Sequence, residues 1–238
     1  MVLFINDYYI KNFKYLKIFD AFRLMKLTYS IQVCNESREL FSLLNVLTHL
    51  IDTEDYIDVV VDSANTTEKV SLVLEHFKDR ITVYERPFDT FSKNCQFHID
   101  VAKGDYVFHI DADEMPQQSL IQILKQVIDE TGAEILAIPR INIHPGATQE
   151  FIEKSKFNIN EVGFINWPDF QMRVHKKCDY ITWTDELHTK LMGSDKVSGI
   201  KPVPSLAMWH IKSIEKQESR WTDGKFNTVK NDLYDRLM

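Results

Sequence analysis

The sequence contains few of the residues that several common protein classes require. Only seven of its 238 residues are glycine, and neither a GxGxxG nor a GxxxxGK string occurs, which excludes the two commonest glycine-rich phosphate-binding loops. The three cysteines, Cys34, Cys95 and Cys178, lie far apart, which excludes a disulfide framework and a cysteine zinc cluster and predicts a cytoplasmic protein. No apolar run approaches the ~20 residues that cross a bilayer, and we find no signal-peptide pattern.

An excess of positive charge is also missing. The chain has 28 Lys and Arg against 35 Asp and Glu, a formal net charge of -7. General nucleic-acid binding needs a basic surface, so we expect none here. Hydrophobic residues make up 44% and charged residues 26%, which is typical of globular domains and excludes disordered and fibrous classes.

The sequence alone does not decide where the folded domain starts. Residues 1–24, rich in aromatics and lysine, precede a second methionine, Met25, after which a β-prone run begins. Either residues 1–24 form an added amphipathic helix, or Met25 is the true start. Such a helix would pack on the domain or make weak contact with a membrane surface. We expect a single domain over residues 25–238.

β-prone runs and amphipathic helical stripes alternate from residue 29 onward. The predicted strands are 29–34, 56–61, 81–84, 106–110 and 135–138, followed after residue 140 by shorter ones at 171–175 and 180–183. Gly104 and Gly132 are expected to end two of the intervening helices in the left-handed conformation. The alternation predicts an α/β fold with a mixed, mostly parallel central sheet.

Ligands of parallel α/β sheets bind beyond the carboxyl ends of the strands, and three of the four predicted exits begin with a carboxylate. The string YVFHIDADEMP at 106–116 ends a buried strand in Asp111-Ala112-Asp113. On an extended segment residues i and i+2 point the same way, so Asp111 and Asp113 are expected to share one Mg²⁺ or Mn²⁺ ion. An acidic surface turn without a metal is the alternative.

These segments resemble the family 2 glycosyltransferases of the GT-A fold, like small bacterial and phage members, over about residues 27–230. SIQVCNES, VVVDSANTTEK and FSKNCQFHIDVAKGDYVFHIDADE are similar to the donor-side motifs. WPDFQMRVHKKCDYITWTDELHTKL and MWHIKS are similar to the acceptor-side motifs. The resemblance implies a Rossmann-like nucleotide-binding sandwich, with residues 25–140 as the nucleotide-sugar half and 141–238 as the acceptor half.

The resemblance also implies a metal-dependent, inverting transfer of a sugar from a nucleotide-diphospho-sugar to a saccharide or other hydroxyl acceptor. The implied donor-binding residues are Asn35, Glu36, Asp62, Lys93, Asn94 and Asp111. The implied ligands of Mn²⁺ or Mg²⁺ are Asp111, Asp113 and His210. For His210 the alternative is a half-buried core histidine. The donor base, the sugar and the acceptor stay open, because this fold serves many substrates.

The catalytic base, which takes the proton of the acceptor hydroxyl, is expected in TWTDELHTKL. Asp185 is the first candidate and Glu186 the second, and His188 completes the predicted catalytic set. Relatives often have Val-His-Glu where this chain has Leu-His-Thr, so Thr189 leaves the identity of the base open. A solvated pair of acids on a strand edge is the alternative.

Aromatic residues gather in the second half, where they either stack on an acceptor sugar or belong to the core. They are Trp167, Phe170, Trp183, Trp209 and Trp221. Arg173 is expected to pair with an acidic acceptor or with Asp169.

Two other functions compete with the transferase. The string VFHIDADE superficially matches haloacid dehalogenase phosphatases, but their Asp-x-Asp closes the first strand of the fold and this one closes the fourth. A non-catalytic domain that binds a nucleotide sugar or a glycan is the other alternative, and Thr189 is the one feature in its favour.

Overall fold

The computed structural model describes residues 3–4, 25–184, 190–214, 221–222 and 225–226. Of the expected N-terminal extension it describes only β1 (Leu3–Phe4), which pairs in parallel with β11 (Val197–Gly199). The amphipathic helix and the membrane contact expected for residues 1–24 therefore lie outside the described residues. Within the described part, no helix combines the length and apolar composition that crossing a membrane requires.

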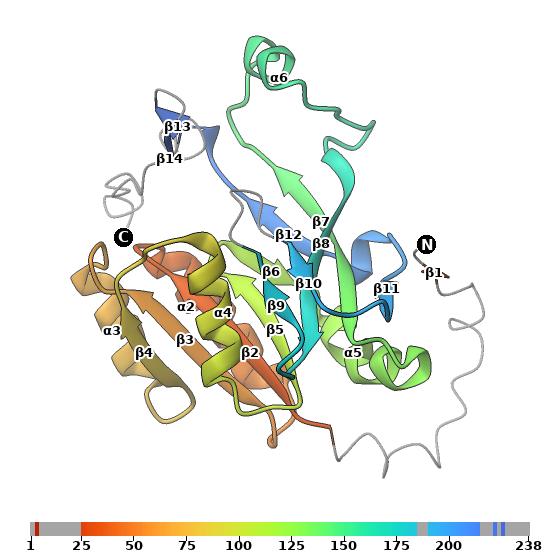
Figure 1. Cartoon of the computed structure of the whole chain (residues 1–238). Coiled ribbons are helices and arrows are strands. Elements are labelled where there is room, and N and C mark those ends of the chain that lie inside the picture. Colours follow the sequence, from red (N-terminus) through yellow and green to blue (C-terminus); the bar gives the residue numbers. More distant parts are fainter. Residues whose placement is uncertain (1–2, 5–24, 185–189, 215–220, 223–224, 227–238) are drawn as a thin grey trace.

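A mixed sheet forms the centre of the molecule (Figure 1). Its parallel part runs in the order β4 (Thr82–Arg86), β3 (Tyr56–Asp62), β2 (Leu27–Val33) and β5 (Tyr106–Asp111). Beyond β5 come β8 (Ile165–Lys176), antiparallel to both neighbours, then β7 (Ile135–Ile143) and β11. The short strands β6 (Glu114–Pro116) and β12 (Met208–Ile211) pair with each other, and β12 also pairs with β7. The predicted mixed, mostly parallel α/β sheet is confirmed.

Helices cover both faces of the sheet. On one face lie α2 (Ser37–Leu50), α3 (Glu68–Phe77) and α5 (Gln118–Thr131). Helix α4 (Phe91–Val101) lies on the other face with β9 (Thr182–Trp183), which pairs with β10 (Leu191–Met192). The apolar stripe of α2 explains its place, because its four leucines at positions 40, 43, 44 and 47 are fully buried. Burial of each stabilises the fold by about 1.5–3 kcal/mol.

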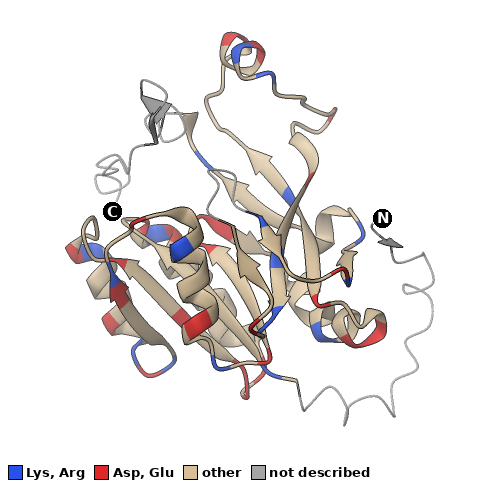
Figure 2. Ribbon diagram, in the orientation of Figure 1, with Lys and Arg blue, Asp and Glu red and all other residues tan. Residues whose placement is uncertain are grey.

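Between β7 and β8 the chain leaves the sheet and forms α6 (Gln149–Ser155), which buries none of its residues and projects from the body (Figure 1). A one-turn 3-10 helix, Pro204–Leu206, precedes β12, and a short hairpin follows it, β13 (Trp221–Thr222) and β14 (Lys225–Phe226). Figure 2 shows Lys, Arg, Asp and Glu spread over helices and loops, while most of the sheet carries neither sign of charge.

The two glycines expected to end helices have different roles. Gly132 ends α5 with φ 59°, as predicted. Gly104 is not in the left-handed region, because α4 already ends at Val101. A Cβ atom at Gly104 would lie 2.7 Å from the carbonyl oxygen of Lys26, so this glycine is needed for the close approach of two backbones. The cap predicted at Gly104 was therefore wrong.

Strands β7 and β8 extend well beyond the predicted runs of 135–138 and 171–175. Pro139 and Pro168 interrupt the apolar alternation that marks a strand in the sequence. The two strands stay paired through register shifts at Leu136/Ala137 and Arg140/Asn142. These shifts accommodate a long antiparallel pair that local sequence patterns do not show.

Candidate active site

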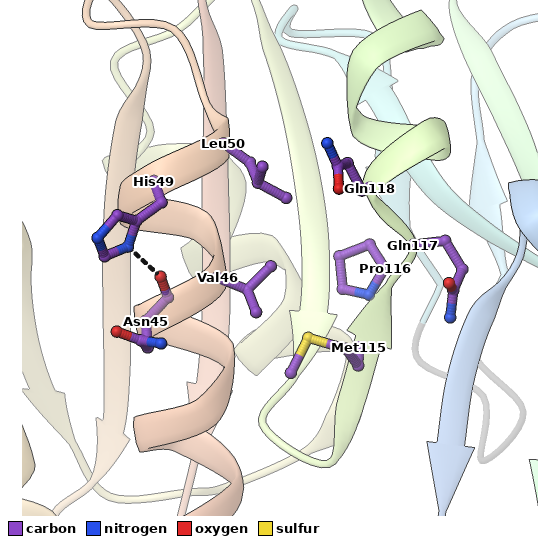
Figure 3. Close-up of a pocket in the computed structure, with 8 residues that line it drawn as sticks. All are labelled: Asn45, Val46, His49, Leu50, Met115, Pro116, Gln117 and Gln118. Atoms are coloured by element: carbon purple, nitrogen blue, oxygen red, sulfur yellow. Dashed lines mark hydrogen bonds between the residues drawn. The ribbon is translucent and has the colours of Figure 1, made fainter.

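Two of the hollows in the described part of the molecule are relevant to the site. The first is an open groove between α2 and the segment Met115–Gln118, where Val46 and Leu50 face Pro116 (Figure 3). None of the predicted catalytic, donor-binding or metal-binding residues lines it. The second is a cleft at the carboxyl ends of β2, β3 and β5. Its lining residues are Gln32, Val33, Cys34, Asn35, Glu36, Val60, Asp62, Phe88, Phe91, Asn94, Asp111, Ala112 and Asp113.

The cleft brings together most of the predicted donor-binding residues. Asn35, Glu36, Asp62, Asn94 and Asp111 all line it, although they come from separate strand exits and from α4. Lys93 is an exposed residue in the first turn of α4 and is not among the lining residues. The strand exits therefore converge as the parallel sheet predicts.

The carboxylates of Glu36 and Asp62 hold the loops that line the cleft. Glu36 Oε2 accepts hydrogen bonds from the backbone N–H groups of Cys34 and Asn35, at 3.0 Å each, and so holds the turn into α2. Asp62 Oδ1 accepts from the N–H groups of Ala64 and Phe88, at 3.2 and 3.1 Å. The Asp62 carboxylate thus joins the loops that follow β3 and β4.

Polar and aromatic side chains also line the cleft. Asn94, buried in α4, donates a 2.7 Å hydrogen bond to Gln32 Oε1 on β2. The rings of Phe88 and Phe91 meet edge to face with centroids 5.2 Å apart. Flat apolar rings beside hydrogen-bonding groups are suited to a planar heterocyclic base.

Asp111 and Asp113 do not share an extended segment, contrary to the expectation from their i, i+2 spacing. Strand β5 ends at Asp111, and a turn at residues 112–113 leads directly into β6. Asp111 Oδ2 lies 2.7 Å from Arg173 Nη2, whereas Asp113 Oδ1 lies 3.8 Å from His210 Nε2. The turn directs the two carboxylates to different partners.

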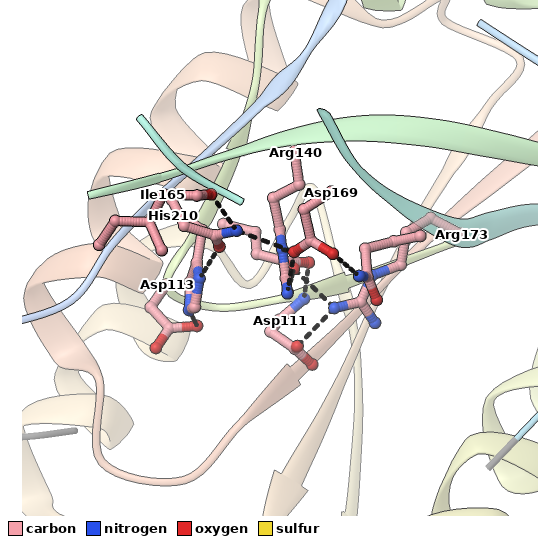
Figure 4. A network of polar contacts seen from close by, with 10 residues as sticks. Asp111, Asp113, Arg140, Ile165, Asp169, Arg173 and His210 are labelled. Carbon is pink, nitrogen blue, oxygen red and sulfur yellow. Dashed lines mark hydrogen bonds and ion pairs between the residues drawn. The ribbon is translucent and has the colours of Figure 1, made fainter. Parts of the chain in front are cut away.

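A network of buried ion pairs surrounds this turn (Figure 4). Glu114, whose side chain is 0% exposed, accepts from Arg140 Nη1 at 2.9 Å and from Arg173 Nη2 at 2.6 Å. Its other oxygen accepts from the N–H of Asp111 at 3.1 Å. Arg140 also donates to Asp169 Oδ2 through Nε and Nη2, at 2.9 and 2.7 Å. The network ties β5, β6, β7 and β8 together behind the turn.

The pKa shifts follow from these pairs. Burial raises the pKa of Asp111, but the adjacent Arg173 guanidinium lowers it by a larger amount. The pKa of Asp111 therefore lies below its usual range. For Arg173, burial lowers the pKa and the carboxylates of Asp111 and Glu114 raise it by more. Asp169 also has a lowered pKa, because burial is outweighed by Arg140 and Asn142. All three groups stay charged at neutral pH.

The sequence profile of glycosyl transferase family 2 matches residues 31–196 of the chain. This chain belongs to glycosyl transferase family 2. The match confirms the predicted enzyme class, which is not that of the haloacid dehalogenase phosphatases.

Solved structures of S. aureus TarS share the fold of this glycosyltransferase. The structure of TarS 1–349 aligns with a TM-score of 0.55 at 15% identity over 79% of this chain and 60% of that one. TarS 1–349 in complex with UDP-GlcNAc aligns with a TM-score of 0.54 at 14% identity, over 79% of this chain and 59% of that one. TarS 1–349 in complex with UDP aligns with a TM-score of 0.54 at 16% identity, over 82% of this chain and 63% of that one. No curated protein matches the chain.

The glycosyltransferase therefore spans about 60% of the length of TarS 1–349. At these identities the likeness shows the fold alone. The α/β sandwich of this chain resembles the GT-A fold of TarS, as the sequence motifs imply.

The side chains around Asp113 suit a metal ion whose remaining coordination positions are filled by a bound substrate. Within the described residues no group of three His, Cys, Asp or Glu side chains could hold a metal ion. Asp113 and His210 lie together, whereas Asp111 pairs with Arg173. Mg²⁺ in phosphate-binding enzymes is usually held by one or two protein ligands plus phosphate oxygens and water. Two guanidinium groups against four carboxylates give this region a formal charge of −2, which also fits a divalent cation.

The predicted catalytic residues of the acceptor side, Asp185, Glu186 and His188, lie outside the described residues, as does Thr189. The nearest described aromatic residue, Trp183, packs edge-on against His109 and His175 in the layer between α4 and the sheet. Trp183 therefore belongs to the core in this structure. Trp167 and Trp209 each meet Phe164 edge to face, with centroids 5.8 Å apart.

The roles of Arg140, Asn142 and Glu114 were not predicted from the sequence, and the alternative in which Arg173 pairs with Asp169 was wrong. Asp169 pairs with Arg140 instead. A sequence signal for Arg140 exists, since it is a charged residue inside the apolar run ILAIPRINI. Buried charges of this kind need a partner.

Proposed function

We propose that this chain is a metal-dependent, inverting glycosyltransferase that uses a UDP-sugar as its donor. The observation that carries the proposal is the convergence of Asp62, Asn94, Asp111 and Asp113 in one cleft, with His210 beside Asp113. The family match supports sugar transfer. The TarS complexes with UDP and UDP-GlcNAc support a uridine donor. Asn35 and Glu36 line the same cleft as Asp62. Lys93 stays a more distant candidate contact.

Uridine suits Asp62 because of the hydrogen-bond pattern of the base. A carboxylate only accepts hydrogen bonds, and the N3–H of uracil is a donor, whereas the N3 of cytosine is an acceptor. Oxygen Oδ2 of Asp62 accepts from Asn65 Nδ2 at 2.8 Å and has capacity for a second donor. Phe88 and Phe91 provide the apolar surface beside it.

Asp113 and His210 would hold the Mn²⁺ or Mg²⁺ ion, with phosphate oxygens of the donor as further ligands. When bound, the cation stabilises the negative charge that develops on the leaving diphosphate. Asp111, fixed by Arg173, faces the same cleft and is assigned to the ribose or to the metal. Because Arg173 holds Asp111 ionised, this carboxylate acts as a hydrogen-bond acceptor.

The acceptor half comprises residues 141–238, and residues 25–140 form the nucleotide-sugar half. Asp185, Glu186 or His188 removes the proton of the acceptor hydroxyl. Its oxygen bonds to the anomeric carbon while the bond from that carbon to the diphosphate oxygen breaks, so one in-line displacement inverts the centre. We assign the acceptor as a saccharide or another hydroxyl compound and the location as the cytoplasm.

Isothermal titration of the full chain with UDP, CDP, GDP, dTDP and ADP, each with Mn²⁺, tests the donor assignment. We expect UDP to bind best and Asp62→Asn to weaken it roughly 10- to 100-fold, since a hydrogen bond to a charged group contributes about 1.5–3 kcal/mol. The matched control Asp79→Asn changes an exposed residue and should leave the affinity unchanged. Equal affinity of Asp62→Asn and wild type for UDP would overturn the role of Asp62, and tighter binding of GDP would overturn the uridine donor.

A further inference from the structure

His210 makes a different contact through each of its ring nitrogens. Nδ1 lies 2.8 Å from Asn142 Oδ1, and Nε2 faces Asp113 at 3.8 Å (Figure 4). The imidazole is 13% exposed, and Asn142 is buried. Which nitrogen carries the proton is therefore decided by the hydrogen-bonding requirements of Asn142.

The orientation of the Asn142 amide follows from Asp169. Nδ2 of Asn142 donates to Asp169 Oδ2 at 2.8 Å and lies 3.5 Å from the carbonyl oxygen of Ile165. A flipped amide would place its oxygen against these two acceptors, so the amide oxygen must face His210. Oδ1 of Asn142 then accepts from Nδ1–H of His210. In the neutral ring Nε2 keeps its lone pair, directed toward Asp113.

Asp169 is itself held in place. Arg140 donates to its Oδ2 through two nitrogens, and Gln171 Nε2 donates to Oδ1 at 2.8 Å. The strand registers bring these residues together, because His210 pairs with Asn142 across β12 and β7, and Arg140 pairs with Asp169 across β7 and β8. The contacts thus form a continuous chain from Arg140 to His210.

We propose that Asn142 and Asp169 are positioning residues for His210, which fix its Nδ1–H tautomer and present the Nε2 lone pair beside Asp113 to a divalent cation. Proteins commonly orient metal-binding imidazoles by a hydrogen bond to the other ring nitrogen. The inference rests on the proposed function for the identity of the ligand. The tautomer of His210 is a separate property of the metal-free protein.

The test compares wild type with Asn142→Ala and Asp169→Asn, both made in the full chain. Asn45→Ala, which changes an exposed residue of α2, is the matched control. Long-range ¹H–¹⁵N NMR on ¹⁵N-histidine protein reports the tautomer, with His210→Gln to assign the signal. Electron paramagnetic resonance of free Mn²⁺ reports the affinity, in the presence of UDP.

We expect the Nδ1–H tautomer in metal-free wild type and in Asn45→Ala, and a mixed tautomer in Asn142→Ala and Asp169→Asn. Mn²⁺ affinity should fall about 10- to 100-fold in these two variants. If Asn142→Ala does not fold, the nearly isosteric Asp169→Asn gives the answer. A neutral wild-type ring that carries its proton at Nε2 overturns the inference. So does a variant with both tautomer and Mn²⁺ affinity unchanged. Wild type that shows the Nδ1–H tautomer but no Mn²⁺ binding contradicts the metal in the proposed function and leaves the positioning role supported.

Discussion

Replacement of Glu114 by glutamine should destabilise the fold strongly, although the two side chains have nearly the same shape. Glu114 is fully buried and accepts three hydrogen bonds, from Arg140, Arg173 and the backbone of Asp111. Glutamine has one accepting oxygen, so its NH₂ group must face either the guanidinium groups or the Asp111 N–H. It also removes the negative charge that both arginines require.

Removing one partner of a buried ion pair costs about 3–5 kcal/mol, and we expect a loss in this range for Glu114→Gln. For a chain of this size, the loss corresponds to a fall in melting temperature of roughly 6–20 °C. Urea unfolding followed by circular dichroism measures the free energy of unfolding. The control is Glu130→Gln on the exposed face of α5, which should change it by less than about 0.5 kcal/mol. Equal stability of Glu114→Gln and this control would refute the reasoning.

Two further predictions concern the packing of the domain. Burial lowers the pKa of His175 to about 4, so the unfolded chain takes up a proton at pH 5 that the folded chain does not. When the pH falls from 7 to 5, protonation of His175 in the unfolded chain should lower the free energy of unfolding by about 2 kcal/mol. Urea unfolding at both pH values should show that the free energy of unfolding falls by about 2 kcal/mol less in His175→Gln than in wild type. An equal fall in the two proteins would contradict this prediction. Gly104→Ala should destabilise by about 1–3 kcal/mol, because the new Cβ lies 2.7 Å from the Lys26 carbonyl oxygen. An unchanged melting temperature would contradict the close approach.

The cleft at the strand exits could be predicted from the sequence because many of its lining residues directly follow strands. A run such as YIDVVVD shows where a strand ends, and parallel strands that alternate with helices bring their exits to one edge. Asn35, Asp62 and Asp111 therefore meet in one cleft, as expected. This inference needs only the order of the elements.

The ion-pair network could not be predicted in this way. Its pairs depend on β8 lying antiparallel between β5 and β7, a placement that strand and helix alternation does not indicate. Arg173 was therefore linked to the nearby Asp169, whereas the sheet brings it to Asp111 and Glu114. The need for glycine at position 104 could not be predicted either, because it comes from the close approach of the Lys26 backbone, which is far away in the sequence.

The central claim is that the strand-exit cleft binds a nucleoside diphosphate together with a divalent cation. The most direct test is the melting temperature of the full chain with UDP, with and without Mn²⁺, for wild type, Asp113→Ala and the control Asp79→Asn. A ligand at 100 times its dissociation constant adds about 2.7 kcal/mol to the stability of the native state. We predict a rise with UDP that depends on Mn²⁺ in wild type and in Asp79→Asn and is lost in Asp113→Ala. The same rise in Asp113→Ala, or no rise with UDP and Mn²⁺ in wild type, would contradict the claim.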